Sequence, residues 1–168
     1  MTKVPKHRVK FRRRRNGMTD YRKRLRYLSG NEPMFTVRFS NKYATIQVIK
    51  YTPAGDVIIY GTTSRILKKY GLNKSYLSLP AIYLTGYFVA SKVKKDIKEG
   101  ILNTGNSNPI KGGRFYAALK GIVDCGVSIP HDKSIYPSEE RLNGSHLKEK
   151  IDIKGIIKKI NEEVKAND

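Results

Sequence analysis

The chain has few of the residues that build disulfides and metal sites. It contains one cysteine, Cys125, and three histidines, His7, His131 and His146, which lie far apart in the sequence. A single cysteine excludes a disulfide framework and fits a reducing cytosol. Neither a CxxC pair nor an HExxH motif occurs, so we expect no metal site, no catalytic centre and no cofactor.

Long apolar stretches are also missing. The chain has no run of about eighteen apolar residues, which excludes a membrane-spanning helix. The N-terminus is basic but lacks the apolar segment of a secretory signal. We therefore expect a cytoplasmic protein with no segment inside a membrane. Its 168 residues suffice for one domain with a real core.

Acidic residues are scarce beside basic ones. Lys and Arg number 34 and Asp and Glu 14, which gives a net charge of +20. So basic a chain is expected to bind nucleic acid or an anionic membrane surface. Residues 1–28 hold twelve Lys or Arg against one acid, Asp20. A segment this basic repels itself and needs a dense polyanion, for which a phosphate backbone is the obvious candidate.

Aromatic residues are threaded through this basic segment. Phe11, Tyr21 and Tyr27 are suited to stacking on unpaired bases. The alternative is a disordered targeting or solubility tail, such as a nuclear address, but such a tail would not need aromatic side chains. We expect the free segment to be disordered and to become ordered on its nucleic-acid partner.

Two features of the segment predict how it is used. Residues 12–15 are four arginines in a row, which in a helix would surround the axis and suit a polyanion that encloses them. Tyr21, Leu25 and Leu28 follow at spacings of four and three, so a helix here would dock this apolar side on the body and present guanidinium groups outward. Arginine suits bidentate phosphate contacts and stacking on bases.

Strand patterns follow the basic segment. Alternating apolar and polar residues predict a half-buried strand over 35–40. Further strands are expected over 43–51 and 57–62, and the short turns between the three predict an antiparallel meander. A short run at 101–104 suggests a fourth strand.

The pattern between and after these strands is helical. Ser78 is an N-cap candidate for a helix whose apolar stripe covers 82–97 and which Gly100 would stop. A second helix is expected after Gly112-Gly113, and residues 127–144 look irregular. The whole order predicts an α/β sheet with helices packed on it.

The C-terminal segment has the clearest helical spacing. Isoleucines and a valine recur over 153–164 with the i, i+3, i+4, i+7 period, and lysines and glutamates cover the other face. We divide the chain into a basic RNA-binding arm (1–28), an α/β body (29–145) and a C-terminal amphipathic helix (146–168).

Several blocks in order resemble a known family. They are the stretch RRRRNGMTDYRKRLRYLSG in the arm, Phe39–Tyr43 with Gln47–Ile49 in the first hairpin, Pro80–Gly86, and Gly113–Gly121 with its continuation to His131. Over roughly residues 5–145 the chain resembles the universal large-subunit ribosomal protein L-eighteen family in its archaeal and eukaryotic form.

The resemblance implies a fold and a role. Members of that family bind 5S rRNA and use a ribonuclease-H-like α/β fold, with a mixed sheet, for binding and not for hydrolysis. The resemblance also implies a place in the central protuberance of the large ribosomal subunit. The partners there would be 5S rRNA, large-subunit rRNA, the L-five protein and other proteins of that region. The protein would be a structural component and not an enzyme, with no membrane partner and no small-molecule substrate.

We expect the RNA-binding residues to come from the arm, the first hairpin and the start of the second predicted helix. Arm cations would neutralise phosphate, hairpin polar groups would hydrogen-bond backbone or base edges, and cations beside Gly112-Gly113 would hold a phosphate at a helix N-terminus. The candidates are Lys10, Arg12, Arg13, Arg14, Arg15, Tyr21, Arg22, Arg24, Arg26, Arg38, Asn41, Lys42, Gln47, Lys111 and Arg114.

Some of these groups have plainer alternatives. These are a solvated sheet face for Arg38 and Gln47, an ordinary turn for Asn41 and Lys42, and a loop of ordinary surface charge for Lys111 and Arg114. We expect Tyr83 and Tyr87 to pack in the core. His131 and Asp132 resemble an acid–base pair, but a capped turn is the better interpretation.

Other functions compete with this one. A nuclease would gather several carboxylates around two divalent metals. The candidate acids are Asp20, Asp56, Asp96, Asp124 and Asp132, and no predicted strand places a second acid beside a first. A general RNA chaperone or a DNA-compacting basic protein would bind unrelated RNA and duplex DNA equally well. No helix-turn-helix, zinc-finger or basic-zipper pattern favours DNA.

Overall fold

A computed structural model describes residues 9–73, 75–145, 147 and 151–166. The first eight residues of the arm, with His7, and also His146 lie outside the described residues. The elements are α1 (Arg12–Arg15), α2 (Tyr21–Ser29), β1 (Met34–Phe39), β2 (Ala44–Thr52), β3 (Gly55–Thr63), the 3-10 helix η1 (Ser64–Tyr70), α3 (Leu79–Val93), β4 (Ile101–Asn103), α4 (Arg114–Asp124), the 3-10 helix η2 (Lys133–Ile135), α5 (Glu139–Leu142) and α6 (Ile153–Ala166).

The strands form one mixed sheet with the order β3-β2-β1-β4. β1, β2 and β3 are the predicted antiparallel meander, and β4 adds to β1 in parallel, with Met34 opposite Ile101. On one face Phe35, Val37 and Ile46 are fully buried. The mixed α/β fold expected from the sequence is therefore confirmed.

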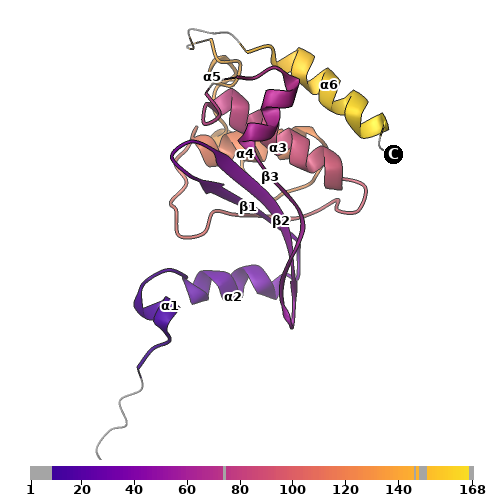
Figure 1. The fold of residues 1–168 in the computed structure, drawn as a ribbon. Helices are drawn as coiled ribbons and strands as arrows, with labels where there is room; N and C mark the ends of the chain where they lie inside the picture. Colours follow the sequence, from indigo (N-terminus) through magenta and orange to yellow (C-terminus); the bar gives the residue numbers. More distant parts are fainter. Residues whose placement is uncertain (1–8, 74, 146, 148–150, 167–168) are drawn as a thin grey trace, which may run out of the picture.

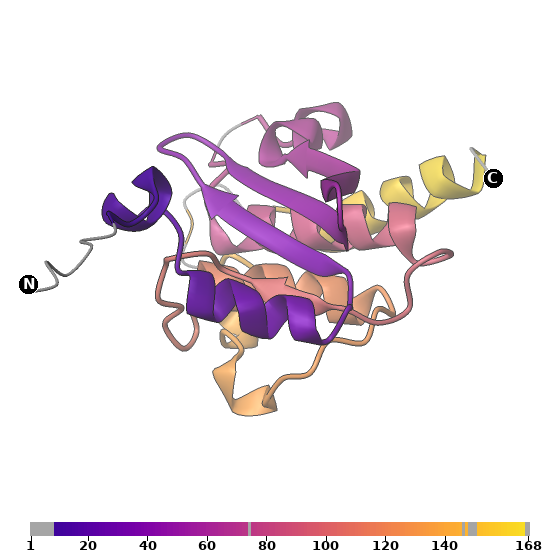
Figure 2. The same ribbon diagram turned by 90° about the horizontal axis from the view of Figure 1, so that it is seen from below.

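The helices lie in layers on the two faces of this sheet. α3 and α4 cover the face that carries Phe35 and Val37, and α2 lies on the opposite side (Figure 1). Seen from below, α2 runs across the front of the sheet (Figure 2). The arm is thus separated by the sheet from the main hydrophobic core.

β1 is not the half-buried strand that alternation predicts. Its first four residues are all buried, so Met34 and Thr36 are covered as well as Phe35 and Val37. Successive side chains point to opposite faces, and Met34 faces the side on which α2 lies. The second cover comes from the arm, which the alternation pattern of β1 alone does not reveal.

Two glycines allow α3 and α4 to touch backbone to backbone. A Cβ at Gly121 would lie 2.1 Å from the carbonyl oxygen of Tyr83, and one at Gly86 would lie 2.4 Å from that of Ala118. Because those neighbours are backbone atoms, they cannot move aside as a flexible side chain can. The close α3–α4 contact therefore requires glycine at both positions.

The C-terminal helix packs on the body of its own chain. Ile156, Ile160 and Val164 of α6 form a second apolar cluster with Leu84 and Phe88 of α3 and with residues of η1. The Asp152 carboxylate caps α6 by accepting a hydrogen bond from the Gly155 amide, at 3.0 Å. The predicted isoleucine stripe is thus the packing face of α6.

Several predicted boundaries need correction. The helix expected to continue to Gly100 ends at Val93, because the amides of Asp96 and Ile97 both bond to the Val93 carbonyl and turn the chain. Ile97 is still buried after this turn. Residues 127–144, expected to be irregular, contain η2 and the single-turn helix α5.

Candidate nucleic-acid interface

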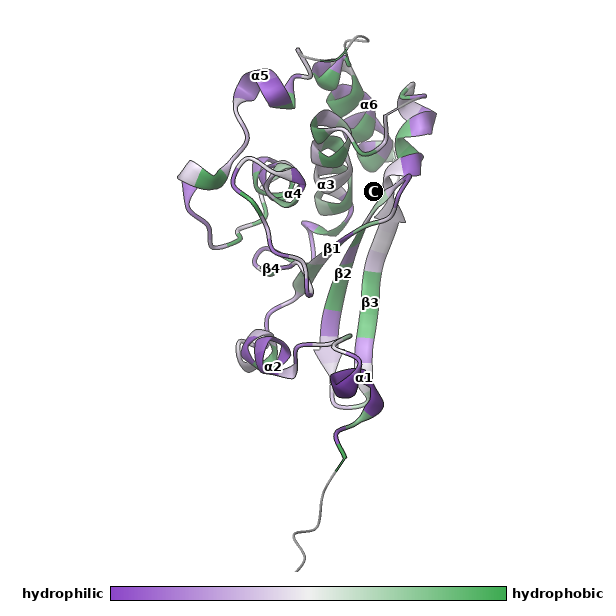
Figure 3. Ribbon diagram, turned by 90° about the vertical axis from the view of Figure 1, so that its left-hand side faces the viewer, coloured by the Kyte–Doolittle hydropathy of each residue, from purple (hydrophilic) through white to green (hydrophobic). Residues whose placement is uncertain are grey.

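The four consecutive arginines form the short helix α1. All four are exposed, as is Lys10 just before them. The Arg13 guanidinium donates from Nε and Nη2 to the Thr19 hydroxyl, at 3.2 and 3.1 Å. No carboxylate among the described residues pairs with α1, which is deep purple in the hydropathy view (Figure 3). These charges are therefore available to a polyanion.

A polar clamp fastens the arm to the loop that follows β4. The Asn106 side chain donates to the Gly17 carbonyl at 2.7 Å and accepts from the Asp20 amide at 3.4 Å. The Lys23 ammonium donates to the Thr104 hydroxyl at 3.2 Å and to the Gly105 carbonyl at 2.8 Å. Residues 17–23 are thus tied to the body, which corrects our expectation that the whole free arm is disordered.

The helix α2 begins at a capping acid. The Asp20 carboxylate accepts hydrogen bonds from the amides of Arg22 and Lys23, at 3.0 and 3.1 Å. The bond from the Lys23 amide is the main reason that the pKa of Asp20 lies below its ordinary value. The single acid of the arm therefore serves the start of the helix.

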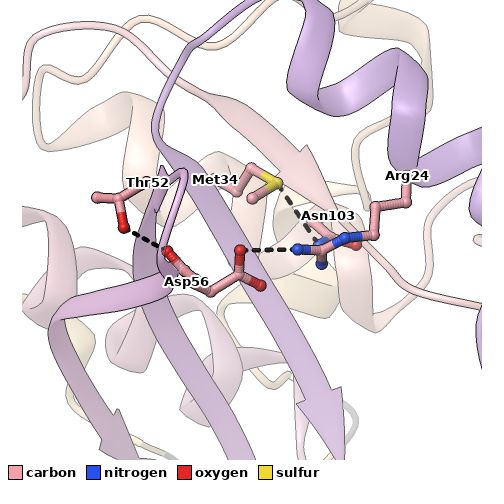
Figure 4. A network of polar contacts seen from close by, with 6 residues as sticks. Arg24, Met34, Thr52, Asp56 and Asn103 are labelled. Atoms are coloured by element: carbon pink, nitrogen blue, oxygen red, sulfur yellow. Dashed lines mark hydrogen bonds and ion pairs between the residues drawn. The ribbon is translucent and has the colours of Figure 1, made fainter.

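An ion pair joins α2 to the far end of the β2–β3 hairpin. The Arg24 guanidinium donates to the Asp56 carboxylate at 2.7 Å (Figure 4). This hydrogen bond raises the pKa of Arg24. Arg24, one of the residues expected to bind RNA, thus already has a carboxylate partner within the chain.

The side of α2 that docks is not the one the spacing predicted. Of the predicted apolar side, Tyr21 is 42% exposed and Leu25 is 67% exposed, and Leu28 is partly covered. Lys23, Arg24 and Tyr27 are partly covered as well. The predicted apolar docking side was thus wrong for Tyr21 and Leu25, because polar contacts at Asp20, Lys23 and Arg24 orient α2 on the body. Arg22 and Arg26 are exposed.

Between the arm and the loop after β4 lies a cleft of about 420 Å³. Its lining includes Arg13, Lys23, Arg24 and Arg38, so four cationic side chains border one hollow. The loop contributes the polar residues Asn103–Ser107, and Met34 and Tyr27 contribute apolar and aromatic surface. The cleft combines the groups that phosphate and base recognition require.

Arg38 is the cation of the cleft that comes from the sheet, on β1. Its Nη1 donates to the carbonyls of Val37 and Asn103, at 2.9 and 3.2 Å, and no carboxylate pairs with it among the described residues. Burial lowers its pKa. A Cβ at Gly105 would lie 2.9 Å from the guanidinium carbon, so the loop backbone lies directly against the charge. Arg38 is thus an exposed cation whose guanidinium lies against the loop backbone and has no carboxylate partner among the described residues.

The other predicted residues of the first hairpin lie in two places, on the sheet face and in the β1–β2 turn. Gln47 lies opposite Thr36 in the sheet, half-buried on the same face as Arg38, and its Cγ would be 2.9 Å from a Cβ at Gly61. Asn41 and Lys42 are exposed in the β1–β2 turn. Arg38 and Gln47 therefore share the sheet face on which the arm lies.

The remaining predicted pair lies elsewhere. Lys111 and Arg114 are exposed at the start of α4, and α4 packs on the sheet face opposite α2 (Figure 1). The fold therefore does not bring them together with the arm and Arg38.

The residues that resembled acid–base chemistry have structural partners. The Asp132 carboxylate caps η2 by accepting from the Ser134 amide. His131 Nδ1 lies 2.6 Å from the Ile129 carbonyl and Nε2 lies 2.5 Å from the Tyr136 hydroxyl. Both ring nitrogens are thereby occupied, which matches the capped-turn interpretation.

Tyr83 and Tyr87, expected in the core, are half-buried against it, and their hydroxyls have partners. The Tyr83 hydroxyl donates to the Asp124 carboxylate at 2.9 Å, and that of Tyr87 donates to the Asn161 side chain at 3.2 Å. Within the described ranges, no three of His, Cys, Asp and Glu are grouped to hold a metal ion. In the same part of the chain, no helix has the length and apolar character needed to cross a membrane.

Some residues of the interface escaped the sequence prediction. Lys23 and the Asn103–Ser107 loop line the cleft, but in the sequence the loop reads only as a polar turn after a strand. A run of Thr, Gly, Asn and Ser directly after the half-buried strand β4 was the available signal, since loops at strand ends often carry binding groups.

Comparison with known proteins shows which family the chain resembles. Residues 5–108 match the family model described as ribosomal large subunit proteins 60S L5 and 50S L18. The large ribosomal subunit protein uL18 of Korarchaeum cryptofilum is 44% identical over 148 residues, which cover 88% of this chain and 76% of the relative. That of Picrophilus torridus is 41% identical over 153 residues, 90% of this chain and 96% of the relative.

Proposed function

Because the chain belongs to the family of ribosomal large subunit proteins 60S L5 and 50S L18, we propose that it binds 5S rRNA and helps to attach it to the large-subunit rRNA. The role is that of a structural component of the central protuberance. The L-five protein and other proteins of that region would be its neighbours, in cytoplasmic ribosomes.

The basic surface around the arm carries this proposal. The exposed arginines of α1, the outward side of α2 with Arg22 and Arg26, and the cleft with Arg38 belong to one end of the molecule. Guanidinium groups without carboxylate partners bind phosphate and release its counterions. Because the clamp and the ion pair to Asp56 hold α2 against the sheet, the cations of arm and cleft form a shaped surface suited to folded RNA.

We propose no reaction and no cofactor for this protein. Of the acids that a nuclease would use, Asp20 caps α2, Asp56 pairs with Arg24, Asp124 accepts from Tyr83 and Asp132 caps η2. These carboxylates serve the fold at separate places. The role that remains is binding, with the body positioning the cationic arm.

A competition experiment tests the proposal. Labelled 5S rRNA is bound to the full chain at moderate salt and displaced by unlabelled 5S rRNA, by a scrambled RNA of equal length and composition, or by duplex DNA. We expect a preference of about 10³ or more for 5S rRNA, as in other specific nucleic-acid complexes. Equal displacement by all three competitors would instead identify a general RNA chaperone or a nucleic-acid-compacting protein.

A further inference from the structure

The strand β3 forms an edge of the sheet. It stands first in the order β3-β2-β1-β4, so among the described strands it pairs with β2 alone. In the view of Figure 3, β3 lies at the margin of the sheet. An edge strand directs backbone donors and acceptors away from its single neighbour. The nine residues of β3 therefore offer main-chain groups to a further strand.

The middle of this edge strand is apolar and exposed. Val57, Ile58 and Ile59 follow one another and are 51%, 54% and 41% exposed, in the part of β3 that is green in Figure 3. Single exposed apolar residues are common on protein surfaces, but a contiguous run on an edge strand marks a binding surface or an aggregation site. The run therefore calls for a partner that covers it.

Pairing with β2 shows which residues share a face of the sheet. Ile58 lies opposite Ile49, so these two isoleucines lie on one face, and Val57 lies opposite Lys50 on the other. The apolar run thus adjoins an isoleucine on one face and an exposed lysine on the other. A strand added next to β3 would meet apolar surface on one face and positive charge on the other.

More cations gather where β3 passes into η1. A shallow hollow of about 420 Å³ there is lined by Thr62, Thr63, Arg65, Ile66, Lys68 and Lys69. Its three cations are exposed, and no carboxylate of the described residues forms an ion pair with them. Asp56, the single acid of β3, is already bound to Arg24. The surroundings of the edge are therefore complementary to an acidic partner.

The charge of this region decides between possible occupants. A second copy would bring the same cations of two molecules together, in a chain with a net charge of +20, and like charges placed opposite each other destabilise paired strands. RNA would satisfy the cations, but its bases stack on aromatic and guanidinium planes, and residues 57–59 offer aliphatic side chains instead. An extended acidic polypeptide satisfies the backbone groups, the apolar run and the cations together.

A bulge limits the length of the partner segment. Val48 pairs with Tyr60 and Ile49 pairs with Ile58, which leaves Ile59 without an opposite residue on β2. A β-bulge bends the strand and interrupts a flat edge. Open-ended pairing of the kind that builds fibres is thereby disfavoured, while a short segment can still pair with β3.

We propose that the outer edge of β3 binds a short extended segment of an acidic protein, which adds to the four-stranded sheet next to β3. Aliphatic side chains of the segment pack on Ile58, and its carboxylates pair with Lys50 and with the cations of η1. Main-chain hydrogen bonds supply affinity and the alternating side chains supply specificity. The site does not require RNA, so the protein can hold an RNA and a protein partner at the same time.

A synthetic peptide of seven residues that alternates glutamate and valine is a direct probe. We expect it to slow the hydrogen exchange of alternate amides in β3 of the full chain, as a newly paired strand does. The same peptide N-methylated at two adjacent central residues cannot pair along either of its edges. It should bind about 5- to 100-fold more weakly, the effect of losing two main-chain hydrogen bonds.

The variant Ile58→Thr tests the apolar contact. Threonine is also β-branched and suits a strand, so the fold should remain while the peptide binds about 5-fold or more weakly. Ile110→Thr is the matched control, because Ile110 is 76% exposed just before α4 and lies outside the sheet. It should leave the affinity for the peptide unchanged, and neither variant should change the affinity for 5S rRNA.

Four results would overturn the inference. They are unchanged exchange in β3 with the peptide, equal binding of the N-methylated peptide, displacement of 5S rRNA by the peptide, and self-association of the chain that Ile58→Thr abolishes. The third would place the peptide on the basic arm, and the fourth would make a second copy the occupant. A chain that bound the peptide at β3 but failed to bind 5S rRNA would reject only the proposed function.

Discussion

Arg24 and Asp56 form an ion pair of 2.7 Å that joins a helix of the basic arm to the end of a hairpin 32 residues further along the chain. Both side chains are about one-third exposed, at 36% and 32%, so the pair contributes little to the stability of the whole molecule. Its importance is positional, because it helps to keep α2 on the sheet and the rest of the arm near the cleft.

The substitution Asp56→Asn should therefore loosen α2 without unfolding the protein. We expect faster hydrogen exchange over residues 21–29 and a change in the free energy of unfolding below about 1 kcal/mol. Exchange measured by mass spectrometry checks this, with Asp96→Asn as the control because Asp96 is exposed and forms no ion pair among the described contacts. Unchanged exchange over α2 in Asp56→Asn would show that the ion pair does not hold the helix.

The cap of α2 should make this helix sensitive to acid. The pKa of Asp20 is lowered in the folded protein below 3.8, mainly by the hydrogen bond from the Lys23 amide. A lowered pKa stabilises the folded form above the unfolded value, and this contribution disappears as the pH falls through the folded value. The amide resonances of Arg22 and Lys23 should therefore shift toward unfolded positions below about pH 4.

The variant Asp20→Asn separates the cap from its charge. Asparagine also caps helices but does not titrate in this range, so the two amides should keep their positions as acid is added. An acid-induced shift of equal size in the variant would mean that another group causes the transition.

The contact between α3 and α4 should not tolerate a methyl group. Gly121→Ala would place Cβ 2.1 Å from the Tyr83 carbonyl oxygen, so the helices must separate, at a cost of about 1–3 kcal/mol or more. Urea unfolding measures the loss. Gly30→Ala is the control, because its Cβ would meet only side-chain atoms at 3.7 and 3.9 Å; if both variants lost the same stability, close packing would not be the cause.

The stability of the C-terminal helix should be independent of RNA binding. Ile160 is fully buried between α6 and the body, so Ile160→Ala should cost about 2–5 kcal/mol, whereas the exposed Lys159→Ala should change stability by less than about 0.5 kcal/mol. Below the unfolding temperature of either variant, the affinity for 5S rRNA should equal that of the wild type. A loss of affinity in folded Ile160→Ala would mean that α6 belongs to the interface.

Local patterns predicted much of this fold. The three-strand meander, the Ser78 and Asp152 caps and the buried stripe of α6 follow from periodicities of two and 3.6 and from capping residues. Such signals act over a few residues, so they survive without knowledge of the tertiary structure. The end of α3 at Val93 was not predicted, because Ile97 continues the apolar spacing of the helix. In the structure Ile97 is buried by the turn that follows α3 and not by the helix itself.

The interface was predictable in composition but not in geometry. The charge of the arm is visible in the sequence, yet the docking side of α2 depends on partners 32 to 86 residues away, at Asp56 and Asn106. Contacts over such distances leave no periodic trace. For the same reason Arg38 could be named as a candidate, while the close approach of Gly105 to its guanidinium could not.

The salt dependence of 5S rRNA affinity tests the central claim most directly. Replacing Arg12, Arg13, Arg14 and Arg15 with Gln should reduce the slope of log K against log salt by about 3, since each lost phosphate contact removes about 0.7–0.9. The matched control replaces the exposed Lys154, Lys158, Lys159 and Lys165 of α6 with Gln and should leave the slope nearly unchanged. Parallel lines for the wild type and the α1 variant, or an equal reduction in both variants, would contradict the account.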